Sequence, residues 1–173
     1  MTLLQPASAC GPALLNTSAS CARCSPVRAS STRRLPPDGL DPRIKSLNYL
    51  NPILARIEAN HAGADEAVLL NAHGLVAEGT ADNLFLVRAG ILLTPPVTDG
   101  ALPGITRELI MRLARASGIE TRKRSLAPYD LHTADECFLS GTGAELVPVR
   151  VMSSPCRRGR RHPTRSSTTV MPI

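Results

Sequence analysis

Two strand–turn–strand patterns follow one another between residues 66 and 96, and they restrict the fold more than any other part of the sequence. In "EAVLLNAHGLVAEGT" (66–80), an apolar run, a turn of small and polar residues and a second apolar run follow in order. "NLFLVRAGILLTPP" (83–96) repeats this arrangement, with "RAG" as the turn and two prolines as the end. Short apolar runs separated by turns of this kind are typical of β-hairpins. We therefore expect two successive hairpins in a sheet.

Apolar spacing predicts helices outside these hairpins. From Ile44 to about Asn60, apolar residues recur every three or four positions, and Pro52 marks either a kink or a later start. Residues 102–118 predict a second helix with a C-terminal glycine at Gly118. Its predicted inner face consists of Ile110, Leu113 and Ala114. We further expect a strand at 119–126, a short helix or loop at 128–135, and two extended segments around a Gly-rich turn at 136–150. Hairpins mixed with helices predict an α+β, or mixed α/β, domain.

The two ends of the chain differ from its middle. Residues 1–40 carry a net charge of +3 and residues 151–173 one of +5, whereas residues 41–150 carry −2. Because the basic charge lies at the ends and not on a patterned segment, we expect no nucleic-acid partner. Neither residues 1–34 nor the basic tail from residue 151 shows a sustained apolar period, so we expect both to be unstructured and the domain to span 35–150.

Cysteine usage and hydropathy exclude further classes. Cys21 and Cys24 form a C-x-x-C pair, but no second pair and no pair of histidines stands at zinc spacing. We therefore expect no metal site. No apolar run reaches transmembrane length, and the first residues lack the pattern of a secretory signal. A cytoplasmic protein without membrane partners is the expectation.

Lys45 lies between apolar residues in the first predicted helix, with Tyr49 one turn later on the same face. A lysine in such a segment has two explanations. Burial would lower its pKa and suit it to attack a carbonyl, or its long side chain would carry the charge out to solvent. The sequence around Lys45 leaves both open.

Three further stretches carry residues suited to chemistry. Glu78 ends a strand just before a Gly-containing turn. "LPGITR" (102–107) and "SGTGAE" (140–145) are loops of small residues whose N–H groups suit an anion such as phosphate. Taken singly, each stretch is equally typical of an ordinary turn or helix start. Together with Lys45 they supply an amine, a carboxylate and two phosphate-binding loops, the set that pyridoxal phosphate requires.

Five stretches between about residues 33 and 150 form one pattern: "IKSLNYLN", "EAVLLNAHGLVAEGTADNLFLV", "LLTPP", "ALPGITR" and "ADECFLSGTGAELVPV". The pattern resembles the class IV, fold-type-IV pyridoxal-phosphate aminotransferases, and the branched-chain amino acid aminotransferases in particular. The resemblance implies the C-terminal domain of the D-amino acid aminotransferase-like fold, pyridoxal 5'-phosphate as cofactor, and a homo-oligomer. It further implies transfer of the amino group of leucine, isoleucine or valine to 2-oxoglutarate. D-amino acid aminotransferases and aminodeoxychorismate lyases share this architecture and remain alternatives, as does a non-catalytic remnant.

Carried over residue by residue, the resemblance makes Lys45 the catalytic Schiff-base lysine and Glu78 the partner of the pyridine N–H. It implies that Tyr49 hydrogen-bonds the phenolic oxygen of the cofactor and that Leu102 packs on its ring. The remaining implied contacts are with the phosphate, from the backbone of Ile105 and Thr106 and the hydroxyl of Thr142, and with the substrate carboxylate, from the amides of Thr142 and Gly143.

The sequence departs from the family pattern within the motifs and at both ends. Ala81 stands where the family has a second glycine in "EG-x-G-[DE]-N". The family has a smaller N-terminal domain before the lysine, and a "V-DG" turn and a Gly-Pro-x-T segment after "PVR", and this sequence shows neither. Both ends are rich in Arg, Ser, Pro and Cys, as translation of a GC-rich gene in a wrong reading frame would be. We therefore expect a truncated or frame-disrupted product with impaired activity.

Overall fold

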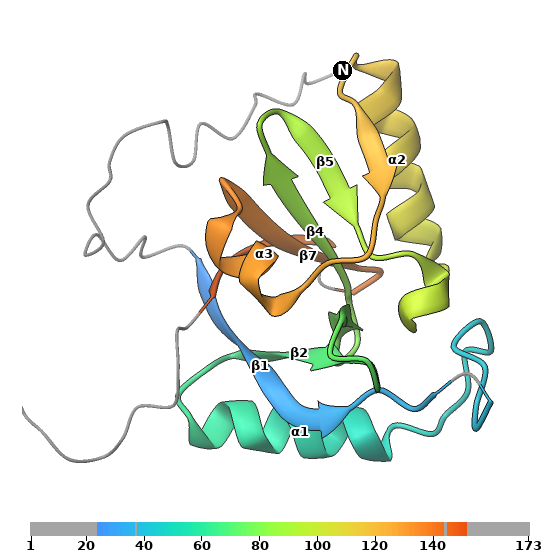
Figure 1. Ribbon diagram of the computed structural model, residues 1–173, viewed down its shortest axis with the longest axis vertical. Helices are drawn as coiled ribbons and strands as arrows, with labels where there is room; N and C mark the ends of the chain where they lie inside the picture. Colours follow the sequence, from blue (N-terminus) through green and yellow to red (C-terminus); the bar gives the residue numbers. More distant parts are fainter. Residues whose placement is uncertain (1–23, 37, 144, 152–173) are drawn as a thin grey trace, which may run out of the picture.

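The computed structural model describes residues 24–36, 38–143 and 145–151, which form a curled sheet with helices on its outer sides (Figure 1). The strands are β1 (Ser25–Arg33), β2 (Glu66–Leu70), β3 (Val76–Gly79), β4 (Asn83–Arg88), β5 (Ile91–Thr94), β6 (Thr121–Lys123), β7 (Glu136–Gly141) and β8 (Glu145–Val151). The helices are α1 (Leu50–His61), α2 (Ile105–Ala116), α3 (Pro128–Thr133) and a 3-10 turn η1 (Val97–Asp99). This mixture confirms the predicted α+β class.

The eight strands lie in the order β3-β2-β1-β8-β7-β4-β5-β6. The two predicted hairpins are present as β2–β3 and β4–β5, each antiparallel. β1 runs parallel to both β2 and β8, and β6 runs parallel to β5. The predicted strand, Gly-rich turn and extended segment at 136–150 form the antiparallel pair β7–β8. Local turn residues therefore predicted every hairpin of the sheet correctly.

The core follows from the alternation of side chains along β2 and β4. Val68 and Leu70 face an inner cluster that also holds Leu84 and Leu86, whereas Ala67 and Leu69 face α1 on the outer side. Because successive side chains of a strand point to opposite faces, a strand covered on both sides needs apolar residues at every position. All five residues of β2 are buried, which explains its continuous apolar run.

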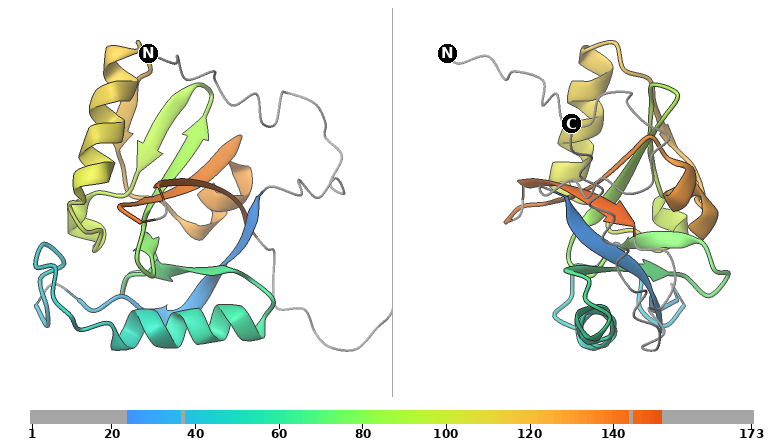
Figure 2. Two further views of the ribbon diagram at one scale, coloured as in Figure 1. Left: turned by 180° about the vertical axis from the view of Figure 1, so that it is seen from behind. Right: turned by 90° about the vertical axis from the view of Figure 1, so that its left-hand side faces the viewer.

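Two helices cover two different outer regions of the sheet. α1 packs on β1 and β2, and α2 packs on β6 and β7 (Figures 1 and 2). Beneath α2, Phe85 and Phe138 stack with ring centroids 5.0 Å apart. The aromatic pair and Met111 of α2 form a small cluster separate from the one under α1. This cluster fastens α2 to β4 and β7.

β1 corrects the expectation that residues 1–34 are unstructured. Ser25–Arg33 form a strand in the middle of the sheet, so the sheet begins before the boundary predicted at residue 35. Only Val27 and Ser30 of this strand are buried, and its sequence, SPVRASSTR, therefore shows no apolar alternation. Pairing with β2 and β8, both distant in the sequence, overrides the weak local pattern. Residues 1–23 and 152–173 lie outside the described residues.

The start of the first helix also differs from the prediction. α1 begins at Leu50 and not at Ile44, with Tyr49 as its N-cap residue. Pro52 thus lies in the first turn, where the missing N–H of a proline costs no intrahelical hydrogen bond. Lys45 and Tyr49 are therefore not one turn apart on a helix face, as predicted, but belong to the loop that leads into α1.

The second helix matches its prediction except for one side of its inner face. α2 is followed by Gly118 in the left-handed conformation, as predicted. Ile110 and Ala114 pack on the buried cluster, but Leu113 is 57% exposed. Arg107 and Met111 are the buried residues of α2 instead. A buried arginine cannot be recognised from apolar spacing, which explains the error.

Candidate active site

A cavity beside Lys45, called the Lys45 cavity below, collects residues from four separate parts of the chain. Its wall includes the segment after β1, the loop before α1, the β3–β4 turn and the residue Leu102 ahead of α2. The lining residues used below are Arg34, Asp41, Lys45, Tyr49, Glu78, Asp82, Asn83 and Leu102. Four of the predicted site residues, Lys45, Tyr49, Glu78 and Leu102, therefore share one cavity.

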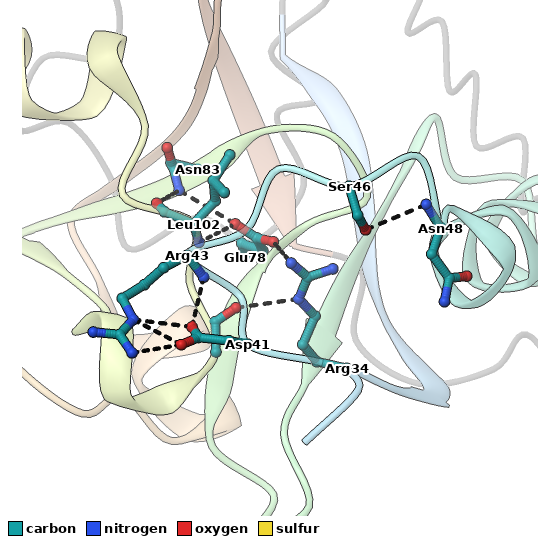
Figure 3. A network of polar contacts seen from close by, with 9 residues as sticks. Arg34, Asp41, Arg43, Ser46, Asn48, Glu78, Asn83 and Leu102 are labelled. Atoms are coloured by element: carbon teal, nitrogen blue, oxygen red, sulfur yellow. Dashed lines mark hydrogen bonds and ion pairs between the residues drawn. The ribbon is translucent and has the colours of Figure 1, made fainter. Parts of the chain in front are cut away.

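Glu78 is the most firmly held group of this cavity. The residue is 6% exposed and lies in β3, one residue before the strand ends at Gly79. Its Oε1 forms an ion pair with the guanidinium of Arg34 at 2.8 Å, and its Oε2 accepts hydrogen bonds from the Leu102 N–H at 2.8 Å and from Asn83 Nδ2 at 3.3 Å (Figure 3). A buried carboxylate needs such partners, because an unpaired charge away from water is strongly unfavourable.

Burial and charge act on Glu78 in opposite directions. Burial raises the pKa of the Glu78 carboxyl above its ordinary value and outweighs the opposing contributions. Those contributions come from the charge of Arg34, the N–H of Leu102, and the charges of Lys45 and Arg107. Three cations from three parts of the chain thus act on one buried acid.

Lys45 reaches the cavity from an exposed loop. Its side chain is exposed, and Ile44 beside it is 59% exposed. The surrounding segment was predicted as helical and core-seeking, but its apolar residues face outward in the described chain. Of the two explanations, Lys45 in this structure therefore fits the exposed lysine and not the buried amine.

The two predicted phosphate loops approach the β3–β4 turn and the start of β4, and of their predicted site residues Leu102 lines the Lys45 cavity. A Cβ added to Gly104, just ahead of α2, would meet Asn83 Oδ1 at 2.3 Å. A Cβ added to Gly141 would meet Asp82 Oδ1 at 2.0 Å. A side chain at Gly104 or Gly141 would therefore have to displace the side chain of Asn83 or Asp82. The other predicted site residues on these loops are Ile105, Thr106, Thr142 and Gly143, none of which lies in the cavity wall.

Two arginines of the site were not singled out from the sequence. Arg34 pairs with Glu78, and Arg107 is 1% exposed and donates hydrogen bonds to the Pro95 carbonyl at 2.7 Å and to Thr94 Oγ1 at 3.3 Å. The only signal for Arg34 was the doubled arginine before the Pro-rich loop. Arg107 lay inside the "LPGITR" motif but resembled a surface charge.

The residues present fit pyridoxal phosphate chemically. Lys45 supplies an exposed primary amine and Glu78 a buried acceptor in the same cavity. No side chain caps the N-terminus of α2 at Gly104, so its first N–H groups remain suited to an anion. Ser140, at the base of the other loop, has a buried hydroxyl without a hydrogen-bond partner among the described residues. An amine, an acceptor and anion-binding groups are what this cofactor requires.

Comparison with known proteins places the chain in a family. Residues 12–152 match the family described as amino-transferase class IV. A relative from Methanocaldococcus jannaschii, which carries the name of a branched-chain-amino-acid aminotransferase, is 56% identical over 119 residues, or 69% of this chain. The chain belongs to the class IV aminotransferases. It spans 41% of the length of that relative.

Solved structures agree with this assignment. The branched-chain aminotransferase of Thermoproteus uzoniensis, solved with norvaline, superimposes with a TM-score of 0.74 at 39% sequence identity. The matched region is 80% of this chain and 47% of the Thermoproteus chain. The branched-chain amino acid aminotransferase of Thermobaculum terrenum, in its PLP form, gives a TM-score of 0.72 at 43% sequence identity. The matched region is 74% of this chain and 43% of the Thermobaculum chain. The relatives named here are therefore all of the branched-chain group.

Two features are absent from the residues that the structure describes. No helix among them is long and apolar enough to cross a membrane. They also hold no group of three or more His, Cys, Asp or Glu side chains placed to bind a metal ion.

Proposed function

We propose that the Lys45 cavity binds pyridoxal 5'-phosphate and that the chain takes part in transferring the amino group of leucine, isoleucine or valine to 2-oxoglutarate. One observation carries the proposal: the exposed amine of Lys45 and the buried carboxylate of Glu78 line a single cavity. The names of the similar proteins favour branched-chain substrates over those of the D-amino acid aminotransferases and the lyases of the same fold.

When bound, pyridoxal phosphate supplies an electron sink for the carbon that loses its proton. Lys45 would hold the cofactor covalently through its Nζ and, once released, would move the proton that leaves the substrate Cα. Glu78 would accept a hydrogen bond from the ring nitrogen and keep that nitrogen protonated. Tyr49 would donate its hydroxyl proton to the phenolic oxygen, and Leu102 would pack on the ring.

The two loops would bind the anionic groups. We assign the phosphate to the backbone N–H groups of Ile105 and Thr106, at the start of α2, and to the hydroxyl of Thr142. We assign the substrate carboxylate to the amides of Thr142 and Gly143. The close approach of both loops to the turn after Glu78 supports this assignment, because one small molecule could then reach both loops and the cavity.

Borohydride trapping tests the proposal directly. The sequence contains two lysines, Lys45 and Lys123, so the site of covalent labelling by pyridoxal phosphate is read from one peptide or the other. Lys123 lies on β6 and forms an ion pair with Glu108 at 3.5 Å, away from the cavity wall. We expect the label on Lys45, loss of it in Lys45→Ala and its retention in Lys123→Ala. Labelling of Lys123 alone would contradict the proposal.

The substrate class is tested separately. The loaded protein should convert its cofactor to the amine form when given leucine, isoleucine or valine, which the change in visible absorbance reports. D-alanine serves as the competing amino donor, and release of pyruvate from 4-amino-4-deoxychorismate reports the competing lyase reaction, which leaves the cofactor in its aldehyde form. A faster response to either of these than to leucine would assign the chain to one of the other groups of the fold.

A further inference from the structure

Arg34 ties three parts of the site together. Its backbone N–H donates to the Leu70 carbonyl at 2.8 Å, which anchors the residue to the end of β2. Its Nε donates to the Gly100 carbonyl at 3.1 Å, and its terminal nitrogen meets Glu78 Oε1 at 2.8 Å. Figure 3 shows the guanidinium beside Glu78, on the side away from Leu102. The planar guanidinium can hold two acceptors at once, which an ammonium group does less well.

The chain leaves room for this arginine. Gly100 has a φ of +101°, a conformation that side chains other than glycine rarely adopt. A Cβ at this position would lie 3.1 Å from Arg34 Cγ. Both the backbone conformation and the space at residue 100 therefore favour glycine, and the Arg34 side chain occupies the space that results.

The hydrogen bonds of Glu78 leave one acceptor position open. An ionised carboxylate offers about four lone-pair sites, two on each oxygen. Oε2 already accepts from Leu102 and Asn83, whereas Arg34 is the one donor to Oε1 among the residues that the structure describes. A further donor in the cavity would therefore meet Oε1, beside the guanidinium.

We propose that Arg34 is a positioning residue that keeps Glu78 ionised and leaves one lone pair of Oε1 for the ring nitrogen of the cofactor. The inference rests on the proposed function, because it assigns a role toward the same cofactor. Arg34 itself touches neither substrate nor cofactor in this scheme and acts through Glu78.

The other charges around Glu78 explain why Arg34 is needed. Lys45 faces Glu78 from the loop and Arg107 from α2, and both favour the ionised acid. Asp41 and Asp82 line the same cavity and carry negative charge. Arg34 is the cation in direct contact with the carboxylate among the described residues. Without it, fewer cations would oppose the effect of burial, which favours the protonated acid, and a protonated acid donates a hydrogen bond where the ring N–H needs an acceptor.

The apo chain allows a test without the cofactor. The side-chain carboxyl carbons of carbon-13-labelled glutamates are followed by NMR during a pH titration, and Glu78→Gln identifies the Glu78 signal. In Arg34→Met we expect the pKa of Glu78 to rise by about 1–3 units, the range for loss of an adjacent opposite charge. Arg33→Met is the matched control, because Arg33 donates to the Ser30 carbonyl and not to Glu78. An unchanged Glu78 pKa in Arg34→Met would overturn the proposal.

A second set of variants keeps the test valid if Arg34→Met does not fold. Arg34→Gln keeps a donor for the Gly100 carbonyl but removes the charge, and should raise the Glu78 pKa as well. Arg34→Lys restores the charge, so it should return the pKa toward that of the parent chain. A pKa that stays raised in Arg34→Lys and unshifted in Arg34→Gln would reject a charge effect.

The loaded chain gives a separate readout. In Arg34→Met we expect the pH dependence of the visible cofactor band to shift, while Arg33→Met leaves it in place. Trapping on Lys45 reports the proposed function independently. A shifted Glu78 pKa without any trapped cofactor would reject the proposed function, and a trapped cofactor with an unshifted Glu78 pKa and band would reject the role of Arg34.

Discussion

The two walls of the Lys45 cavity differ in how firmly the fold holds them. On the wall formed by β3 and β4, Glu78 and Asn83 are each 6% exposed and bonded to several partners. On the opposite wall, the loop before α1 leaves Leu47 94% exposed, and Lys45 is exposed as well. Buried polar groups with several hydrogen-bond partners are held in one arrangement, whereas segments with few buried contacts open easily. Glu78, the proposed acceptor for the ring nitrogen, is therefore held in place by the fold, whereas Lys45 lies on a segment that can adjust.

The largest expected contrast between the two walls is in stability. Leu69 of β2 is fully buried beneath α1, so Leu69→Ala should lower the free energy of unfolding by about 2–5 kcal/mol. Leu47→Ala, on the exposed loop, should change it by no more than about 0.5 kcal/mol. Urea unfolding followed by circular dichroism measures both. A large loss in Leu47→Ala would mean that the loop is as firmly packed as the sheet.

Two acids, one on each wall of the Lys45 cavity, have pKa values shifted in opposite directions. Glu78 has a raised pKa through burial, whereas the hydrogen bond from the Arg43 side chain lowers the pKa of Asp41 in the exposed loop. A raised pKa in the folded state means that Glu78 adds stability below pH 4.5, its ordinary pKa, and that this is lost as pH rises through the folded-state value. Asp41 acts in reverse: its contribution is present above pH 3.8 and is lost as pH falls.

Unfolding free energies measured across pH check both signs. The difference between the parent chain and Glu78→Gln should fall as pH rises above about 4.5, and the difference between the parent chain and Asp41→Asn should fall as pH decreases below about 3.8. Parallel slopes for the two pairs would show that the two walls do not differ electrostatically.

The sequence predicted structure that depends on neighbouring residues and missed structure that depends on distant ones. Hairpins such as β2–β3 were predicted, because their apolar runs and turn residues are adjacent in the chain. β1 was missed, since it is stabilised by two strands far away in the sequence and buries only Val27 and Ser30. Apolar spacing continued upstream of α1, so the loop that carries Lys45 was taken for helix. Local patterns predict local structure, and tertiary pairing has to be observed.

The candidate site shows the same difference between local motifs and tertiary contacts. The resemblance to a family named Lys45, Tyr49, Glu78 and Leu102, which share one cavity. It did not name Arg34, because the segment holding it showed no periodic pattern. The ion pair between Arg34 and Glu78 depends on the pairing of β1 with β2, which no short motif encodes.

A smaller effect is expected for the contact that fastens the β3–β4 turn. Thr80 donates its hydroxyl proton to Glu66 Oε1 at 2.6 Å, and Glu66 also pairs with Arg56 of α1. Thr80→Val should cost about 1.5–3 kcal/mol at most, the range for a hydrogen bond to a charged group. Thr133→Val is the control, since its hydroxyl donates to the Tyr129 carbonyl, which is a neutral acceptor. Equal losses of unfolding free energy in the two variants, measured by urea unfolding, would contradict a special role of the Glu66 contact.

The smallest expected effect on stability belongs to the residue with the largest expected effect on function. Lys45 forms no hydrogen bond or ion pair with any residue that the structure describes, and its side chain is exposed. Lys45→Ala should therefore change the unfolding free energy by no more than about 0.5 kcal/mol, while it removes the covalent labelling by pyridoxal phosphate. Urea unfolding and borohydride trapping on the same preparation measure the two effects side by side, with Lys123→Ala as the control. A loss of stability comparable to that of Leu69→Ala would mean that Lys45 is held by the fold, and that the amine wall of the cavity is as preorganised as the wall that carries Glu78.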